Sequence, residues 1–463
     1  MNHAPCEQIH ETSLALLEDP GIKLEHDEVY QRLRKAGARP GNAARVLRLP
    51  RAMVAEYLAL APHRIILADR RGRQVELSAH SAPLYWTCPG MFLEEKGQVR
   101  PFTSADMAAI TRLADALDNV HGVFGMALDD VPPLARDFVG LRIMAENTGK
   151  HLRALCFGSL GIEAMLEMRH VVGDSPWFSI GFTAHGPLRW THLALDIFLK
   201  SAGHCIPTTI NGEPMAGASG PVTLAGSLAL GNAEILAGIV VNQALEPGRP
   251  CIHNLGLAHV MDMRSAIAVT GGPENALMAA AAAAMARFYD LPSCSWVSTE
   301  AMAPEAQAAL EKMFGFLVHS QAGVSLIWGV GQLESEMTIS PTQMVIDNEM
   351  ISFIRHYLKG LPVTERTLAL DTIRKVGISG SFLDAEHTLR HYRDHLYHPA
   401  LLWRQRRTTW EAQGMPTLQV AAQHKARALM AEARSVPCPD ESQRRALQEI
   451  EHRFISRIHS SDS

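Results

Sequence analysis

The sequence predicts an α/β fold: a (β/α)8 TIM barrel with an N-terminal cap and a C-terminal helical extension. Between residues 81 and 360, eight short apolar runs alternate with segments of helical spacing. Short, continuously apolar runs are typical of buried parallel strands, and the intervening helices cover such strands. Eight units in succession favour a closed barrel over an open doubly wound sheet. The glycine-rich dinucleotide fingerprint of such open sheets is absent in the required strand-to-helix context.

The repeating units can be placed in order along the chain. The strands are expected at residues 84–88, 123–128, 152–157, 178–182, 205–210, 251–255, 293–298 and 324–329. The helices are expected at residues 104–117, 134–147, 161–172, 189–202, 223–243, 273–289, 304–318 and 342–358. Six consecutive alanines, 279–284, suit a helix that packs close to the strands, because alanine combines high helix propensity with a small side chain.

Two flanking regions complete the predicted organisation. Residues 1–80 are expected to form a cap, and residues 361–463 a helical extension. The cap contains helices at 7–17 and 27–36, and a hairpin whose strands are 64–68 and 74–77. The extension contains helices at 423–434 and 442–458, and its higher charge density predicts a peripheral layer on the barrel or on a second subunit.

Composition excludes several classes of protein. The formal charge of -5 is spread along the chain, which argues against a nucleic-acid surface. No uninterrupted apolar run reaches the roughly 18 residues of a membrane span, and the N-terminus lacks a signal-peptide pattern. We therefore expect a cytoplasmic protein with neither nucleic acid nor membrane as a partner.

The seven cysteines contain no C-x-x-C pair and do not form a disulfide framework. Five of them fall in predicted strands, where we expect them to fill tight core positions. These are Cys88, Cys156, Cys205, Cys251 and Cys294.

The candidate site follows from the barrel, because barrel active sites lie where the strands end and the loops into the helices begin. This rule selects Trp86, Cys88, Asp129, Asp130, Phe157, His185, Asn211, Glu213, His253, Asn254, Thr299, Glu300, Trp328, Gln332, Glu334 and Glu336. Aromatic rings, carboxylates and amides together suit a small organic ligand with a cationic or strongly polar centre. No motif identifies a catalytic residue among them.

Each candidate also has a structural interpretation. Trp86 and Trp328 lie on neighbouring strands, where they would form two walls of a cage for a methylated ammonium or simply fill the barrel. Asp129 and Asp130 precede Pro132, so they would cap the next helix. Glu300 and the other loop carboxylates are either near one pocket or solvated.

Histidines raise the question of a metal site. His387, His391, His395 and His398 follow helical spacing, but no HExxH arrangement accompanies them, so we interpret this cluster as structural. His185 and His253 would bind a metal only if carboxylates converged on them. We expect no metal in this chain.

A glycine-rich turn opens the long helix predicted at 223–243. Gly217 and Gly220 bound this turn, which would let the backbone approach a large flat partner with free N–H groups pointing outward.

Six segments of the chain follow the pattern of one protein family. They are GASGPVTLAGSLALGNAEILAGIVVNQ (217–243), PGRPCIHN (247–254), MDMRSAIAVTGGPENALMAAAAAAMARFYDLP (261–292), AGVSLIWGVGQLES (322–335), FLDAEHTL (382–389) and GIKLEHDEVYQRLRKAGARP (21–40). Through them the chain resembles the trimethylamine and quaternary-amine methyltransferase family across nearly its whole length.

This resemblance implies a barrel that holds a methylated amine near its mouth and passes a methyl group to Co(I) of a corrinoid. The corrinoid (cobalamin-type) would be carried by a separate protein, with Gly217 and Gly220 under the corrinoid or substrate. The chain itself would bind no cofactor, and as family members are commonly oligomeric, we expect a homo-oligomer. A quaternary ammonium is already a charged leaving group, so the lack of a visible general acid is expected.

One departure narrows the expected substrate. Family members that demethylate trimethylamine carry pyrrolysine in the loop that here reads WGVGQLESE (328–336). This chain has only standard residues there, with Gln332 or Glu334 at the replaced position. The resemblance therefore implies a betaine such as glycine betaine, proline betaine or carnitine. The alternatives are a barrel enzyme acting without corrinoid, a metal-dependent hydrolase, and a binding protein for a methylated amine.

Overall fold

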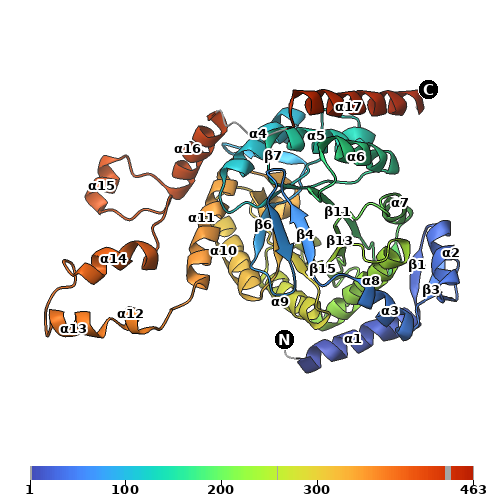
Figure 1. The fold of residues 1–463 in the computed structure, drawn as a ribbon, viewed down its shortest axis with the longest axis horizontal. Helices are drawn as coiled ribbons and strands as arrows, with labels where there is room; N and C mark the ends of the chain where they lie inside the picture. The colour runs from blue at the N-terminus through green and yellow to red at the C-terminus, as the bar shows by residue number, and fades with distance from the viewer. Residues whose placement is uncertain (1–2, 258, 433–438, 462–463) are drawn as a thin grey trace.

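Eight parallel strands close into a barrel in the computed structural model, which describes residues 3–257, 259–432 and 439–461 (Figure 1). The strands follow one another around the ring in chain order, and the last pairs with the first. They are β6 (Leu84–Thr87), β9 (Gly122–Phe124), β10 (His151–Arg153), β11 (Phe178–Thr183), β13 (Thr208–Asn211), β15 (Cys251–Gly256), β18 (Ser293–Trp296) and β19 (Leu326–Val330). The predicted (β/α)8 barrel is confirmed.

Helices surround the barrel, one after each strand (Figure 1). They are α4 (Ser104–Ala116), α5 (Arg136–Asn147), α6 (Ser159–Val172), α7 (His192–Lys200), α8 (Leu224–Leu245), α9 (Pro273–Phe288), α10 (Ala306–Gln321) and α11 (Pro341–Leu358). Local sequence explains where several begin. Thr103 and Asp106 form a capping box on α4, and Ser340 caps α11, whose first residue is a proline.

Helix α8 is apolar on all sides, as a helix enclosed by other elements should be. It packs against β13 and β15 on one side and against the N-terminal helices on the other. By length and composition it is the one described helix that could span a membrane, but 83% of its most apolar window is buried in this fold. A buried core helix passes the same test, so this is weak evidence for a membrane span.

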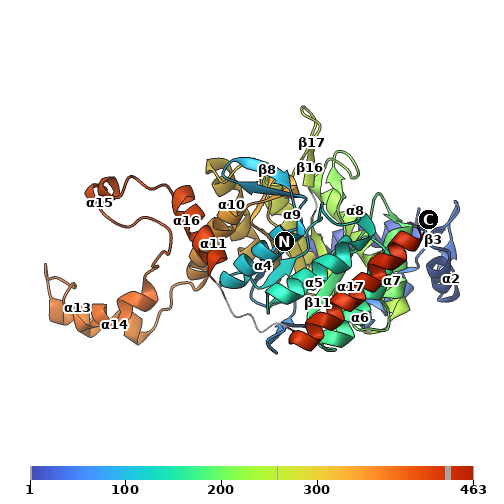
Figure 2. The same cartoon turned by 90° about the horizontal axis from the view of Figure 1, so that it is seen from above.

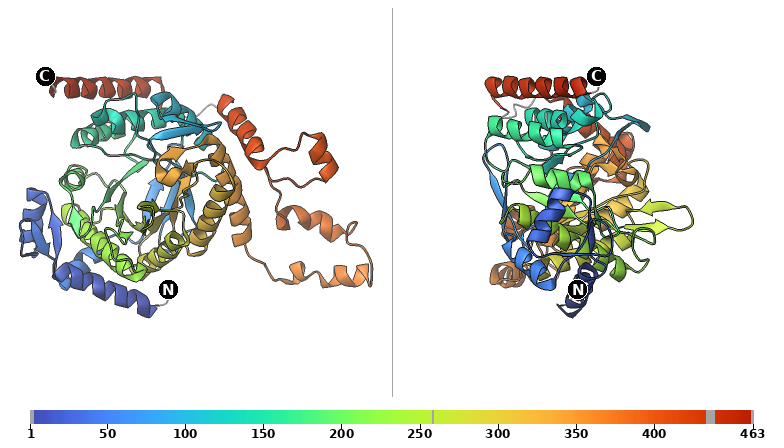
Figure 3. Two further views of the ribbon diagram at one scale, coloured as in Figure 1. Left: turned by 180° about the vertical axis from the view of Figure 1, so that it is seen from behind. Right: turned by 90° about the vertical axis from the view of Figure 1, so that its right-hand side faces the viewer.

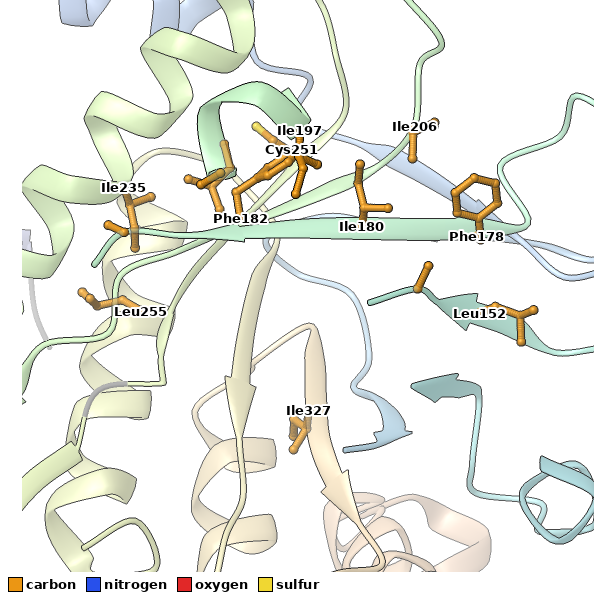
Figure 4. Packing of buried hydrophobic residues seen from close by; sticks show 14 of the residues in the cluster. Leu152, Phe178, Ile180, Phe182, Ile197, Ile206, Ile235, Cys251, Leu255 and Ile327 are labelled. Atoms are coloured by element: carbon orange, nitrogen blue, oxygen red, sulfur yellow. The ribbon is translucent and has the colours of Figure 1, made fainter. Parts of the chain in front are cut away.

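The outward-facing side chains of the strands meet these helices in the main hydrophobic core. In Figure 4, Phe178, Ile180 and Phe182 of β11 lie on one side of the strand, towards Ile197 of α7. Phe182 stacks on Phe198, with ring centroids 3.6 Å apart. The core thus lies between barrel and helices, as the uniformly apolar strand sequences predicted.

One predicted strand begins later than expected, which changes the position of Cys205. The segment 205–210 enters β13 only at Thr208, and Cys205 lies in an exposed turn with φ of 51°. The Glu246 carboxylate accepts hydrogen bonds from the N–H groups of Gly203 and Cys205 and so holds this turn outside the sheet. The prediction of a core position is wrong for Cys205. Among the other cysteines, Cys88, Cys251 and Cys294 are buried, Cys156 is half-buried, and Cys438 lies outside the described residues.

The N-terminal region contains α1 (His3–Glu18), β1 (Ile22–Leu24), α2 (Asp27–Lys35), β2 (Arg39–Pro40), β3 (Val46–Arg48) and α3 (Arg51–Leu60). Helices α1 and α3 pack on α8. The predicted hairpin, β4 (Ile65–Ala68) and β5 (Gln74–Leu77), packs against the N-terminal end of the barrel. There the N–H of Ala68 donates to the carbonyl of Pro176, just before β11.

Two small sheets lie on the opposite, C-terminal side, where the strands end. One consists of β14 (Met215–Ala216), β16 (His259–Asp262) and β17 (Ile267–Val269), and the β16–β17 part protrudes from the molecule (Figure 2). The other consists of β7 (Phe92–Glu95), β8 (Gln98–Pro101), β20 (Gln332–Leu333) and β21 (Thr338–Ile339). Both sheets are formed by the loops that follow barrel strands.

After α11 the chain divides into a packed part and a projecting part. Helix α16 (Leu418–Ala431) packs on α11 and α4, and α17 (Glu441–Ser461) crosses α5 and α6 (Figures 1 and 2). Of the helix predicted at 423–434, the last two residues lie outside the described part. The remaining helices extend away from the barrel (Figures 1 and 3). They are α12 (Glu365–Leu368), α13 (Leu370–Val376), α14 (Glu386–His395) and α15 (Arg407–Ala412).

The barrel interior gives a direct test of this packing at Gly122. A Cβ atom at this position would lie 2.5 Å from the indole Nε1 of Trp86, a rigid and fully buried side chain. We predict that Gly122→Ala lowers the free energy of unfolding by about 1–3 kcal/mol, the usual cost of overpacking. Urea denaturation followed by circular dichroism measures it.

Gly140 on α5 is the matched control. A Cβ there would meet nothing within 4 Å, so Gly140→Ala should leave stability unchanged or raise it by up to about 1 kcal/mol through helix propensity. Equal losses in both variants would contradict the packing described for Trp86.

Candidate functional site

The loop after β19 is held by a buried ion pair. Lys312 of α10 and Asp347 of α11 lie 2.6 Å apart, and neither side chain is exposed. The Lys312 ammonium also donates to the carbonyls of Gly329 and Gln332, both at 2.8 Å. The Asp347 carboxylate accepts from the N–H of Gly331 at 2.7 Å. Two helices thereby fix the backbone of the loop from both sides.

Three consecutive residues of this loop adopt the left-handed conformation. Glu334, Ser335 and Glu336 have φ of 53°, 50° and 80°. Such angles cost of order 1–3 kcal/mol each for residues other than glycine and persist only where surrounding contacts impose them. Here Ser335 donates its N–H to the carbonyl of Thr299 at 2.9 Å. This backbone conformation directs the Glu336 side chain towards the end of β6, where the Cys88 thiol donates to the Glu336 carboxylate at 3.7 Å.

Two further carboxylates lie close enough to act on this region electrostatically. Glu213 follows β13, and Glu234 lies on α8. Burial raises the pKa of Glu213 to about 7. Burial, together with the negative charge of Glu213, raises the pKa of Glu336 to about 8 and that of Glu234 to about 7. Within the described part of the chain, none of the three forms an ion pair with a lysine or arginine.

This arrangement is suited to a cation. Carboxyl groups that lack a cationic partner and are withdrawn from water have raised pKa values, because the charged form is poorly solvated. A positively charged ligand placed between Glu213 and Glu336 would lower these pKa values and favour the ionised forms. The mouth of the barrel is therefore acidic and uncompensated.

The two predicted cage walls are both buried. Trp86 is fully buried and stacks on His151, with centroids 5.1 Å apart, so the barrel-filling alternative holds for it. Trp328 is 3% exposed, and its ring meets Phe124 edge to face at 5.0 Å. Both point inward because residues alternate between the two faces of a strand, which an apolar run does not reveal. Whether Trp328 contacts a ligand stays a prediction.

The predicted amides come together inside the barrel. Asn254 donates to Asn211 at 2.9 Å, and Asn211 donates to Thr183 at 3.0 Å, which links the ends of β15, β13 and β11. The Oδ1 atom of Asn254 is buried and has no hydrogen-bond partner within the described residues.

Several other candidates lie on the rim or are occupied by loop contacts. Phe157 and His185 are exposed on the loops after β10 and β11. Glu300 accepts hydrogen bonds from the N–H groups of Thr270 and Gly271, and Glu334 accepts from the Thr338 hydroxyl, so both carboxylates fix loops.

The Gln332 amide donates to the adjacent Leu333 carbonyl, while its Oε1 is buried and unpaired. Thr299 donates its hydroxyl to Glu311.

The aspartates before Pro132 cap a different helix from the one predicted. Asp130 accepts from the N–H and hydroxyl of Ser104, the first residue of α4. The predicted cap on the following helix is wrong, because the loop after β9 folds back onto the preceding helix.

The histidines do not converge on a metal site. His253 points away from the mouth and contacts Asn232 of α8 at 3.0 Å, far in the chain from the exposed His185. His387, His391 and His395 lie along α14 with successive ring centroids 4.5 and 5.6 Å apart. Over residues 3–257, 259–432 and 439–461, no group of three or more His, Cys, Asp or Glu is arranged to hold a metal ion.

In the glycine turn before α8, the N–H groups of three residues donate hydrogen bonds to carbonyls of the same turn. Gly217 donates to the carbonyl of Gly220, while Ala218 and Gly220 donate to that of Met215. Outward-pointing N–H groups are therefore not available from these three residues. For the N–H groups that follow at the start of α8, an outward direction stays a prediction. A Cβ at Gly220 would lie 2.6 Å from the Ser227 hydroxyl, so its glycine is needed for packing within the chain.

Sequence reasoning missed Arg153 and Glu234. Each is a charged residue in a stretch that was assigned from its apolar character, the strand at 152–157 and the helix at 223–243. A single charge inside such a stretch was the available signal. Cys88 and Glu336 were noted as rim residues, but their contact depends on barrel closure.

A closed (β/α)8 barrel with uncompensated carboxylates at the ends of its strands defines this protein as a barrel enzyme with a mouth suited to a small cation. The chain belongs to the trimethylamine methyltransferase family, because the family model described as "Trimethylamine methyltransferase (MTTB)" matches residues 1–458. It is a methyltransferase.

Curated relatives agree with this assignment. The chain is 30% identical to the trimethylamine methyltransferase MttB of Desulfitobacterium hafniense, over 93% of this chain and 89% of the relative. It is 32% identical to the MttB of Methanosarcina barkeri, over 90% and 87%. It is also 30% identical to a glycine betaine methyltransferase of Desulfitobacterium hafniense, over 90% and 89%.

Solved structures share the fold. A hydroxylamine complex of MtmB aligns with this chain at a TM-score of 0.55 and 12% sequence identity. The alignment covers 92% of this chain and 86% of the MtmB chain. The monomethylamine methyltransferase MtmB of Methanosarcina barkeri matches the same shares with a TM-score of 0.52 and 11% identity. At this identity the likeness concerns the fold alone.

The raised pKa values predict how cation binding depends on pH. Tetramethylammonium should bind more tightly as the pH rises from 6 to 8, by up to about a hundredfold per unit below pH 7 and by about tenfold from pH 7 to 8, because Glu213 and Glu336 must both ionise to hold it. Binding should release protons, since the cation lowers both pKa values. Calorimetry in buffers of different ionisation enthalpy measures affinity and proton release together.

Glu336→Gln should weaken binding and flatten the pH profile above pH 7, while Glu300→Gln, at a carboxylate already occupied by loop N–H groups, should keep the wild-type profile. Binding that is independent of pH in the wild type would contradict the cation site.

Proposed function

We propose that this protein transfers a methyl group from a quaternary, betaine-type amine to the cobalt of a corrinoid carried by a separate protein. The observation that carries this proposal is the set of uncompensated carboxylates at the mouth of a barrel in this family. Two facts support the quaternary amine. The loop at 328–336 has no pyrrolysine, and a glycine betaine methyltransferase is among the relatives.

The residues of this chain bind and orient the amine. Glu213 and Glu336 hold the quaternary ammonium, and the left-handed loop fixes Glu336 in place. A docked corrinoid would supply a reduced cobalt as the nucleophile for the methyl carbon, and the electron pair of the broken C–N bond would stay on the nitrogen. The amine departs neutral because the quaternary nitrogen already carries the positive charge. No general acid is therefore needed.

The corrinoid protein would dock on the rim beside Gly217. Val222 and Met263 are 71% and 73% exposed, and both side chains lie within 3.7 Å of the Cβ position of Gly217. Exposed apolar side chains gathered at the mouth are typical of an interaction surface. In this proposal the chain binds no cofactor of its own, and α8 serves as a core helix of a cytoplasmic enzyme.

Methyl transfer to a reduced corrinoid protein tests the proposal. The protein is mixed with the partner and with glycine betaine, proline betaine, carnitine, choline or trimethylamine. The corrinoid spectrum and mass spectrometry of the amine report transfer. A betaine should be demethylated. Tight binding of a betaine without transfer would favour a binding protein, and demethylation without the partner would favour a corrinoid-independent enzyme.

The docking surface predicts a separable defect. Val222→Glu should lower kcat/KM for the corrinoid protein about fivefold or more, as expected for loss of an apolar interface contact, and leave amine binding unchanged. Val75→Glu, at an exposed position on the hairpin at the other end of the barrel, is the matched control. Equal effects of the two substitutions would exclude this rim as the docking site.

We further propose that the projecting helices pack on a second copy of the chain. The large apolar residues that are each more than half exposed there are Leu361, Val363, Leu368, Leu370, Ile373, Ile378, Leu383, Leu389, Leu396 and Met415. A monomer rarely leaves so many large apolar side chains in water.

Analytical ultracentrifugation of the full chain should therefore give the mass of a homo-oligomer. The double substitution Leu383→Asp and Leu389→Asp should lower the mass of this assembly. Ser381→Asp, at an exposed polar position, should not. A monomeric wild type would contradict this proposal.

A further inference from the structure

Arg153 is a buried cation without a counter-charge. It lies on β10 inside the barrel and is 4% exposed. Its guanidinium donates to the carbonyl of Ala154 at 2.7 Å and to the Thr209 hydroxyl at 3.2 Å. Its Nε has no partner, and no described carboxylate lies within ion-pair distance. A buried guanidinium with only neutral acceptors is costly, so its retention calls for an anionic partner.

The fold makes room for this side chain. A Cβ at Gly181 of β11 would lie 1.9 Å from the Arg153 Nη2 atom, so only glycine leaves space for the guanidinium. Phe124 and Trp328 flank it, with ring centroids 5.0 and 5.8 Å from its central carbon. Aromatic faces stabilise a guanidinium but do not neutralise it. The surrounding residues therefore hold the Arg153 guanidinium in a defined position, and its Nε–H group remains available to donate to a ligand.

Other buried hydrogen-bond donors on the barrel strands are also unsatisfied, and one of them, Trp328, flanks Arg153. Trp86, Trp328 and Trp296 occupy facing positions on three neighbouring strands, and each has a buried indole N–H without a partner within the described residues. Buried donors are normally paired. An unpaired donor on Trp328 beside the unneutralised guanidinium of Arg153 favours a ligand group that accepts hydrogen bonds and carries negative charge. A carboxylate has both properties.

Arg153 and the rim carboxylates lie at different depths. Thr209, the partner of Arg153, precedes Asn211 by two residues on β13, and Glu213 follows two residues later. Two residues of a strand span about 7 Å and bring side chains to the same face. Arg153 thus lies one inward-facing position below Asn211, and the acidic mouth lies above it. The enclosed end is cationic and the open end is anionic.

We propose that Arg153 binds the carboxylate of a zwitterionic substrate, so that the enzyme selects trimethylammonium carboxylates over amines that lack an acid group. This inference rests on the proposed function and deepens it. The carboxylate points into the barrel towards Arg153, and the ammonium lies between Glu213 and Glu336. That orientation turns the N-methyl groups towards the rim, where the methyl acceptor docks. Choline and trimethylamine carry a cation for Glu213 and Glu336 but no carboxylate to neutralise Arg153.

Equilibrium binding to the protein alone tests this proposal without the corrinoid partner. Glycine betaine and γ-butyrobetaine are compared with choline and tetramethylammonium by calorimetry at pH 8. The wild type should bind the better betaine at least tenfold more tightly than choline. Arg153→Gln should abolish that preference while choline affinity stays within about twofold. Arg153→Lys, which keeps the charge, should retain part of it.

A wild-type measurement makes the test independent of variant folding. Acetate should compete with the betaine for the Arg153 position but should not displace tetramethylammonium. Equal affinity of the wild type for betaine and choline, or an unchanged preference in a folded Arg153→Gln protein, would overturn the proposal. Failure of methyl transfer with the betaine preference intact would instead count against the proposed function alone.

Discussion

Pairing between the last barrel strand, β19, and the first, β6, is the constraint on which the site depends. Closure satisfies the backbone hydrogen bonds of both edge strands and places residues some 240 positions apart side by side. It sets Cys88 against Glu336 and Trp86 beside Trp328. Because all eight strands are parallel, closure also gathers their C-terminal ends at one rim, where loops from distant parts of the sequence meet.

The loop after β19 shows how the scaffold maintains an unfavourable local conformation. The Lys312–Asp347 pair is buried between two helices and forms hydrogen bonds to the loop backbone. Each charge is therefore compensated by the other and by backbone groups of the loop. Glu213 and Glu336 lack such partners. Burial thus has opposite consequences in the two places. Paired charges fix the loop, and the unpaired carboxyl groups have raised pKa values because their charged forms are poorly solvated.

Much of the scaffold was predictable from sequence because local patterns report local structure. The apolar runs located all eight strands, and the strand patterns at 64–68 and 74–77 located the hairpin. Errors arose where a distant residue decides the backbone. Glu246 holds Cys205 outside β13, and Ser104 draws Asp130 towards α4. Within the candidate site, Glu213 and Glu336 could be placed at strand ends, but the direction of Trp86 could not, since buried parallel strands have no polar alternation.

By itself the sequence determined the fold class, the family and the residues that lie at the ends of the strands. Periodicity and extended similarity depend only on the order of residues, and the structure and the comparisons confirm them. Only the tertiary structure decided which charges are paired. Arg153 and Lys312 are both buried cations. Lys312 forms an ion pair with the carboxylate of Asp347, whereas Arg153 donates only to neutral acceptors such as the Thr209 hydroxyl. Charge compensation depends on distance in space and on burial, and neither is encoded in a local pattern.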